Sequence, residues 1–118
     1  MRKKDYFQNC IDPKEILPKK KWFKNIENLW SPSEESALKE LHNFIKNRIL
    51  NYSEGRNFPN IIGTSKLSPF IKFGQIHVET IWNECSKAKN KTIGTSKFLA
   101  EIGWREFNHT LINHFPHM

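Results

Sequence analysis

SPSEESALKELHNFIKNRILNY, residues 31–52, has the clearest helical pattern in this chain of 118 residues. Its large apolar side chains recur three or four positions apart, which is the spacing of one helix face. These are Leu38, Leu41, Phe44, Ile45, Ile49 and Tyr52. Ser31 has the position of an N-cap, Pro32 that of the first helical residue, and Glu34 that of the partner in a capping box. The pattern predicts a helix from Ser31 to about Asn51.

A loop and a short helix are expected next. Residues 53–63 contain two glycines and a proline, which rarely continue a helix. Ser68 and Pro69 then have the pattern of a cap followed by a first helical residue. Gly74, six residues later, predicts a stop in the left-handed conformation. We therefore expect a helix of about two turns over residues 68–74.

Two further helices complete the predicted fold. One is indicated by the apolar spacing in Val78–Cys85 and ends in the lysine-rich residues 87–91. The other is expected to start near Thr95 or Ser96 and to stop at about His114, before a proline. No alternating strand pattern of useful length occurs, so the predicted fold class is all-α.

The first 30 residues have a different character and predict an extended, basic lead-in. They contain 8 Lys or Arg against 4 Asp or Glu, and two prolines, without a helical period. The second half of this segment contains large apolar groups that a solvated tail would not need. These are Leu17, Trp22, Phe23, Ile26, Leu29 and Trp30. We expect two parts: a linker over 1–30 that packs on the domain, and a helical domain over 31–118.

The composition predicts one small, basic domain that is rich in aromatic residues. The formal net charge is +7, the apolar fraction is 37%, and the chain has 9 Phe, 4 Trp and 2 Tyr. So many aromatic residues are not typical of a disordered chain. The charge permits binding to a polyanion. It does not identify one, because 15 of the 19 cations are lysine, a bias that base composition can also produce.

Several function classes are excluded by missing patterns. No apolar run is long enough for a membrane span or a signal peptide, so we expect a soluble, cytoplasmic protein without a membrane partner. Cys10 and Cys85 form no metal or redox motif. His109, His114 and His117 are not spaced to share one face, which argues against a metal site. No motif of a conventional hydrolase is present.

The last predicted helix gathers polar groups on one face. Phe98, Glu101, Arg105 and His109 are spaced three and four apart, so that a ring, a carboxylate, a guanidinium and an imidazole point the same way. Such a stripe is suitable for a helix that faces a polar ligand. The ordinary alternative is a surface ion pair between Glu101 and Arg105, which also have the favourable i, i+4 spacing.

Residues 64–68 combine three hydroxyls and a lysine before a helix start. Backbone N–H groups, hydroxyls and an ammonium group together can bind a phosphate. Ser and Thr before a helix are more often simple caps. On the pattern alone, simple capping is therefore the favoured interpretation.

Taken together, several blocks of the sequence resemble the beginning of the FAD-binding domain of DNA photolyases and cryptochromes. The blocks are Trp30–Glu34, Tyr52–Pro59, Gly63–Gly74, Phe98–Phe107 and His114–His117. They occur in the family's order and at matching spacing, and the resemblance covers about residues 13–118. It is closest to the class I-like deoxyribodipyrimidine photolyases and implies a partial helical FAD-binding domain.

The resemblance implies FAD as the cofactor and assigns residues to it. The block at residues 64–68 wraps the FAD pyrophosphate in the family, although Lys66 stands where arginine is more usual. Phe98 has the position of a ring beside the flavin. The expected cofactor-binding residues are Tyr52, Thr64, Ser65, Lys66, Leu67, Ser68, Phe98, Glu101 and Arg105.

The same resemblance implies DNA containing pyrimidine dimers as the partner. Glu101 and Trp104 match the carboxylate and the indole that contact the extruded dimer, and are the expected catalytic residues. The expected DNA-binding residues are Arg56, Glu101, Trp104, Arg105 and Asn108. Asn108 replaces a common tyrosine, and Gly103 replaces a larger aliphatic residue.

The implied activity is light-dependent repair, in which a reduced flavin splits cyclobutane pyrimidine dimers, a carbon–carbon lyase reaction. We expect the chain to be an incomplete part of such an enzyme, with the antenna chromophore not encoded here and the rest of the FAD domain supplied by a separate chain. One alternative is a cryptochrome-type flavin photosensor. The other is a small basic helical module that binds nucleic acid without flavin.

Overall fold

The computed structural model describes residue 20, residues 22–87 and residues 92–117. The chain divides into two compact units, Met1–Ser31 and Pro32–Met118. The first unit contains α2 (Lys24–Leu29), where the sequence predicted only an extended lead-in. The rings of Trp22 and Phe23 meet edge to face just before this helix, with centroids 6.0 Å apart. That the lead-in packs on the domain stays a prediction.

The first helix of the second unit is α3 (Glu34–Asn47), and its cap differs from the predicted one. Ser33, with an extended backbone, is the N-cap, and its Oγ accepts the N–H of Ser36 at 3.1 Å. The prediction of Ser31 as the cap was wrong, because Pro32 precedes the cap instead of opening the helix. Glu34 and Glu35 then occupy the first turn, where negative charge favours the helix dipole.

The helical pattern of residues 31–52 is interrupted at Arg48, where φ is −128°. A 3-10 turn, η1 (Ile49–Asn51), and a single turn, α4 (Tyr52–Gly55), follow it. The prediction of one continuous helix to Asn51 was therefore wrong, as was a loop that begins at residue 53. The approach of another helix explains the change: a Cβ on Gly94 would lie only 2.0 Å from the carbonyl oxygen of Ile49.

Two helices follow the loop, α5 (Ser68–Lys72) and α6 (Val78–Lys87). The predicted stop at Gly74 is confirmed, since its φ is +69°. The predicted cap at Ser68 was wrong: Leu67 has the cap position, no side chain caps the helix, and Ser68 is its first residue. The lysine-rich residues 88–91 lie outside the described residues. No strand occurs in the described ranges, so the all-α fold class is confirmed.

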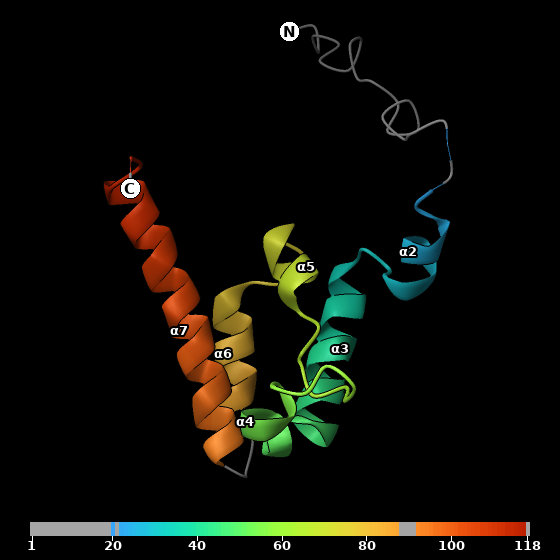
Figure 1. Cartoon of the computed structure of the whole chain (residues 1–118), viewed down its shortest axis with the longest axis horizontal. Helices are drawn as coiled ribbons and strands as arrows, with labels where there is room; N and C mark the ends of the chain where they lie inside the picture. Colours follow the sequence, from blue (N-terminus) through green and yellow to red (C-terminus); the bar gives the residue numbers. More distant parts are fainter. Residues whose placement is uncertain (1–19, 21, 88–91, 118) are drawn as a thin grey trace, which may run out of the picture. The chain divides into compact units, whose positions relative to one another are not determined.

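The longest helix, α7 (Ile93–His114), begins two to three residues earlier than predicted and ends where predicted. Thr92 caps it, with Oγ1 accepting the N–H of Thr95 at 3.3 Å. Within the second unit, α7 runs beside α6, and α4 packs near the start of α7 (Figure 1). None of the helices described is long and apolar enough to cross a membrane.

The core of the second unit is part aromatic and part aliphatic. Phe44 of α3 is fully buried, and its ring lies 4.7 Å from that of Phe98 and 5.6 Å from that of Tyr52. The rings of Tyr52 and Phe98 are 5.3 Å apart and nearly perpendicular. The other large side chains that are fully buried are Leu41, Leu67, Ile81 and Cys85. Two helices, α3 and α7, and the α4 turn thus meet at one aromatic cluster.

Candidate functional site

A pocket of about 530 Å³ opens beside the aromatic cluster of Phe44, Tyr52 and Phe98. Three stretches of chain that are far apart in sequence form its walls: α4, the segment leading into and through α5, and one face of α7. The lining residues are Tyr52, Ser65, Ser68, Ile71, Lys72, Phe98, Glu101, Ile102, Arg105 and His109. The wall therefore combines two rings, two hydroxyls, a carboxylate, an imidazole and two cations.

The two rings form the rigid part of the wall. Phe98 is 3% exposed and Tyr52 is 9% exposed, so both are held by the core while still reaching the pocket. Burial raises the pKa of the Tyr52 phenol above its usual value. The positive charge of Arg56 opposes this shift, and the negative charge of Glu101 adds to it. The phenol is thus neutral near pH 7.

Gly55 and Gly63 allow the segment of residues 64–68, which contains three hydroxyl groups, to reach the pocket. A Cβ on Gly63 would lie 2.4 Å from the carbonyl carbon and oxygen of Gly55, so the loop after α4 folds back closely on that turn. Leu67 is 1% exposed and anchors the far end of the segment in the core. Between these anchors Lys66 adopts a positive φ of 56°, which is uncommon for a residue with a side chain.

The α7 face gathers the predicted polar groups at one place. Phe98, Glu101, Arg105 and His109 all line the pocket, as the helical spacing predicted. The expected alternative, an ion pair between Glu101 and Arg105, is not what forms. Arg105 bonds instead to its neighbour Glu106.

Glu101 pairs with Arg56, which follows α4 and lies 45 positions away in sequence. Nη1 of Arg56 donates to Oε1 of Glu101, and the two side chains are 30% and 37% exposed. The guanidinium carbon of Arg56 also lies 5.8 Å from the centroid of the Tyr52 ring. This contact links α4 to α7 at the edge of the pocket, and sequence spacing gave no signal for it.

Comparison with known proteins shows which proteins the chain resembles. No family model matches the chain. A deoxyribodipyrimidine photo-lyase of Agrobacterium fabrum is 38% identical over 107 residues, which are 87% of this chain and 22% of that protein. A protein of the same name from Alkalihalophilus pseudofirmus is 40% identical over 79 residues, 66% of this chain and 16% of that protein.

A solved structure shows the same similarity to photolyases. The crystal structure of a class III photolyase from Agrobacterium tumefaciens superposes with a TM-score of 0.77 and 36% identity, over 85% of this chain and 21% of that one. This chain is similar to photolyases over most of its length. It spans about a fifth of the length of the photolyases it matches. The finer expectation of a class I-like member stays a prediction, since this solved photolyase is of class III.

Six of the residues that the photolyase resemblance assigns to the cofactor line the pocket together. They are Tyr52, Ser65, Ser68, Phe98, Glu101 and Arg105. The other three do not line it: Thr64 and Lys66 are exposed, and Leu67 is buried in the core. The site is thus assembled from part of the expected set, and each residue's role in it stays a prediction.

Two of the expected DNA contacts lie outside the pocket, on exposed parts of α7. Trp104 is 61% exposed, and its ring meets that of Phe107 edge to face, with centroids 5.7 Å apart. Asn108 is exposed as well. The third, Arg56, does not line the pocket but contacts two residues that do, Glu101 and Tyr52.

Three pocket residues were not predicted from the sequence: Ile71, Lys72 and Ile102. A signal for Lys72 was available, because it follows Ser68 at the i, i+4 spacing that aligns side chains on a helix. Ile71 gave no such signal, since an apolar residue in a short helix is ordinarily assigned to the core.

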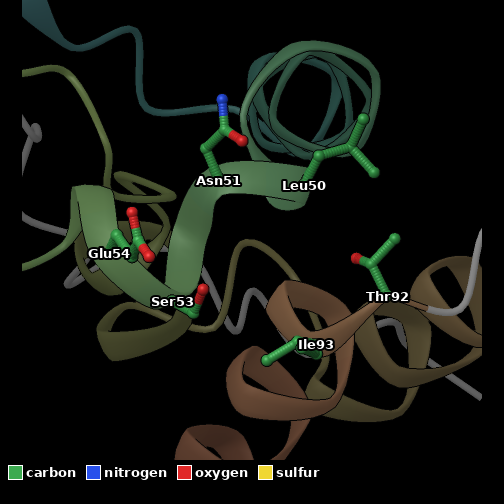
Figure 2. A pocket seen from close by; sticks show the side chains of 6 residues that line it. All are labelled: Leu50, Asn51, Ser53, Glu54, Thr92 and Ile93. Carbon is green, nitrogen blue, oxygen red and sulfur yellow. The ribbon is translucent and has the colours of Figure 1, made fainter.

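A second pocket, of about 520 Å³, lies where η1 and α4 approach the start of α7 (Figure 2). Its lining residues are Leu50, Asn51, Ser53, Glu54, Thr92 and Ile93, none of which was a predicted site residue. Among the residues described, no group of three or more His, Cys, Asp or Glu could hold a metal ion.

Proposed function

We propose that this chain forms part of the FAD site of a light-dependent DNA photolyase that splits cyclobutane pyrimidine dimers. The main support is the pocket itself, where six residues assigned to the cofactor by resemblance come from three separate segments. The names of the related proteins, deoxyribodipyrimidine photo-lyases, point to the same activity. No single residue would make this case, since each could be an ordinary cap or core residue.

The chemical groups in the pocket wall fit FAD. The rings of Tyr52 and Phe98 are suited to the flat parts of the cofactor, and the hydroxyls of Ser65 and Ser68 to its phosphate oxygens. Lys72 and Arg105 supply the positive charge that a diphosphate needs. This charge matters because α5, with five residues, is too short to provide a strong dipole. When bound, a reduced flavin supplies the electron that opens the dimer.

The exposed surface of α7 fits the DNA side of the reaction. Enzymes reach a damaged base by extruding it from the duplex into a pocket. Trp104 offers an accessible ring for stacking on such a base, and Glu101 offers a carboxylate that accepts hydrogen bonds at the pocket wall. In this proposal Asn108, which is exposed on α7, lies near the DNA backbone.

The remainder of the FAD pocket would come from residues outside this chain. The chain matches about a fifth of a photolyase. On one side, no described residue covers the pocket. We therefore expect the 118-residue chain alone to bind FAD weakly. A separate partner chain that supplies the remaining residues is part of this proposal.

A chimera tests the proposal. The 107-residue match in the Agrobacterium fabrum photolyase would be replaced by the corresponding residues of this chain. Flavin content is measured from absorbance, and repair from the loss of dimers in an irradiated oligonucleotide under blue light. We expect a folded chimera with nearly one flavin per chain and light-dependent repair. A folded chimera without flavin would refute the proposal.

The alternatives predict other results. A chimera that retains flavin but repairs no dimers would favour the cryptochrome-type photosensor. For the 118-residue chain itself, DNA binding that is sensitive to salt but indifferent to dimers and to added FAD would favour the basic helical module.

A further inference from the structure

The ion pair between Arg56 and Glu101 has an asymmetric position. Glu101 lines the pocket, whereas Arg56 does not, so the guanidinium contacts the carboxylate from outside the pocket lining. It therefore acts on a ligand in the pocket through the lining residues that it contacts, Glu101 and Tyr52.

Arg56 is itself held at several points. Its guanidinium lies over the Tyr52 ring, and its backbone N–H bonds to the carbonyl of Tyr52 at 3.3 Å. Tyr52 is in turn fixed by edge contacts with Phe44 and Phe98. A planar guanidinium with this support loses little further freedom when it binds a carboxylate. The core therefore determines where the Glu101 carboxylate lies.

The other cations near the pocket do not take this role. Arg105 lines the wall but bonds to Glu106. Lys72 and His109 line the wall as well, and in the described ranges neither is paired with Glu101. The pKa of Arg56 is raised above its usual value, chiefly by its hydrogen bond to Glu101, which agrees with a direct charged contact.

We propose that Arg56 is a positioning residue that holds the Glu101 carboxylate at the pocket wall as a hydrogen-bond acceptor. The bond from Nη1 to Oε1 leaves Oε2 of Glu101 available. A carboxylate fixed in this state accepts hydrogen bonds and donates none. The wall therefore selects a ligand that presents an N–H or O–H group to Glu101. This last step rests on the proposed function, since a pyrimidine base presents such an N–H.

The Tyr52 phenol serves as a probe for this arrangement, because it senses both partners. Arg56 lowers the pKa of Tyr52, and Glu101 raises it. We expect Arg56→Ala to raise the midpoint of the Tyr52 titration and Glu101→Gln to lower it. Arg56→Lys should give a value between wild type and Arg56→Ala. The full 118-residue chain is titrated by tyrosinate absorbance, and Tyr52→Phe identifies the contribution of Tyr6.

Glu106→Gln is the matched control. It makes the same substitution on the same helix and also removes an arginine's partner. Because Glu106 is not among the charges that shift the pKa of Tyr52, the midpoint of the Tyr52 titration should not move in Glu106→Gln. Shifts in the same direction for Arg56→Ala and Glu101→Gln, toward the ordinary tyrosine value, would indicate loosened structure and overturn the inference.

Failure of this inference and failure of the proposed function are distinguishable. Opposite shifts of the Tyr52 titration midpoint in Arg56→Ala and Glu101→Gln support the positioning role even if the chimera binds no flavin. In a chimera that does repair dimers, Arg56→Lys should retain more activity than Arg56→Ala. The loss in Arg56→Ala should appear in both KM and kcat, because a misplaced acceptor weakens binding and the reacting geometry alike. Equal activity of the two variants would contradict a positioning role.

Discussion

At the scale of single residues, a substitution of Glu101 is the most direct test of the predicted chemistry. Glu101→Gln keeps the size of the side chain but replaces one acceptor oxygen by a donor amide. A hydrogen bond to a charged group contributes roughly 1.5–3 kcal/mol, so we expect dimer splitting in the chimera to fall about 10- to 100-fold. Glu106→Gln, on an exposed part of the same helix, should leave the rate unchanged. An unaffected rate in Glu101→Gln would refute its assigned role.

Lys66 allows a test of backbone strain. Its φ of 56° costs a residue with a Cβ about 1 kcal/mol, whereas glycine adopts it freely. We expect Lys66→Gly to leave the free energy of unfolding unchanged or to raise it by up to about 1 kcal/mol in urea titrations. The same substitution at Lys39, exposed within α3, should lower it by about 1 kcal/mol. A large loss in Lys66→Gly would show that the lysine side chain stabilises the loop.

At the scale of elements, two glycines of α7 predict opposite effects. A Cβ on Gly94 would meet the carbonyl oxygens of Ile49 and Leu50 at 2.0 and 2.9 Å, whereas one on Gly103 would meet nothing within 4 Å. We expect Gly94→Ala to destabilise the fold by roughly 1–3 kcal/mol or more, through forced separation of α7 from η1. Gly103→Ala should stabilise it by about 0.5–1 kcal/mol. Thermal unfolding followed by circular dichroism distinguishes the two variants. Equal shifts of their unfolding temperatures would contradict the close contact of Gly94 with η1.

The contact of Gly94 with Ile49 and Leu50 shows which helix boundaries the sequence could predict and which it could not. Local signals were sufficient for α6, for the stop at Gly74 and for the end of α7, because periodicity and turn residues act within a few positions. They were insufficient for the break at Arg48, since its cause is the approach of Gly94, 46 positions later. Hydroxyl groups also mislead locally: Ser31 and Ser33 are both plausible caps, and only backbone geometry selects Ser33.

The candidate site was predictable to a similar extent. The α7 face followed from helical spacing, whereas Ser65 and Ser68 were assigned to the site through the family resemblance, because their hydroxyls alone favoured simple capping. The pair between Arg56 and Glu101 was not predictable from spacing, because it depends on where the loop after α4 returns. Contacts between distant segments require the fold, whereas contacts within a helix do not.

At the scale of the whole molecule, Cys85 reports on the integrity of the core that supports the pocket. Its side chain is fully buried, and burial, with a smaller contribution from Glu84, raises the pKa of the thiol to about 12. In the unfolded chain a thiol ionises near pH 8.5. The folded state thus favours the protonated thiol, so stability is fully present below pH 8.5 and falls as the pH rises toward 12.

We therefore expect the free energy of unfolding to fall by about 1 kcal/mol between pH 8.5 and pH 9.5, measured by urea titration under reducing conditions. Cys85→Ala should be less stable at pH 8 but should lose less over this interval. Tyr52, whose pKa is also raised, adds to the decline only above about pH 10, the usual tyrosine value. An identical decline in Cys85→Ala would mean that other groups cause it and that the thiol is accessible in the folded chain.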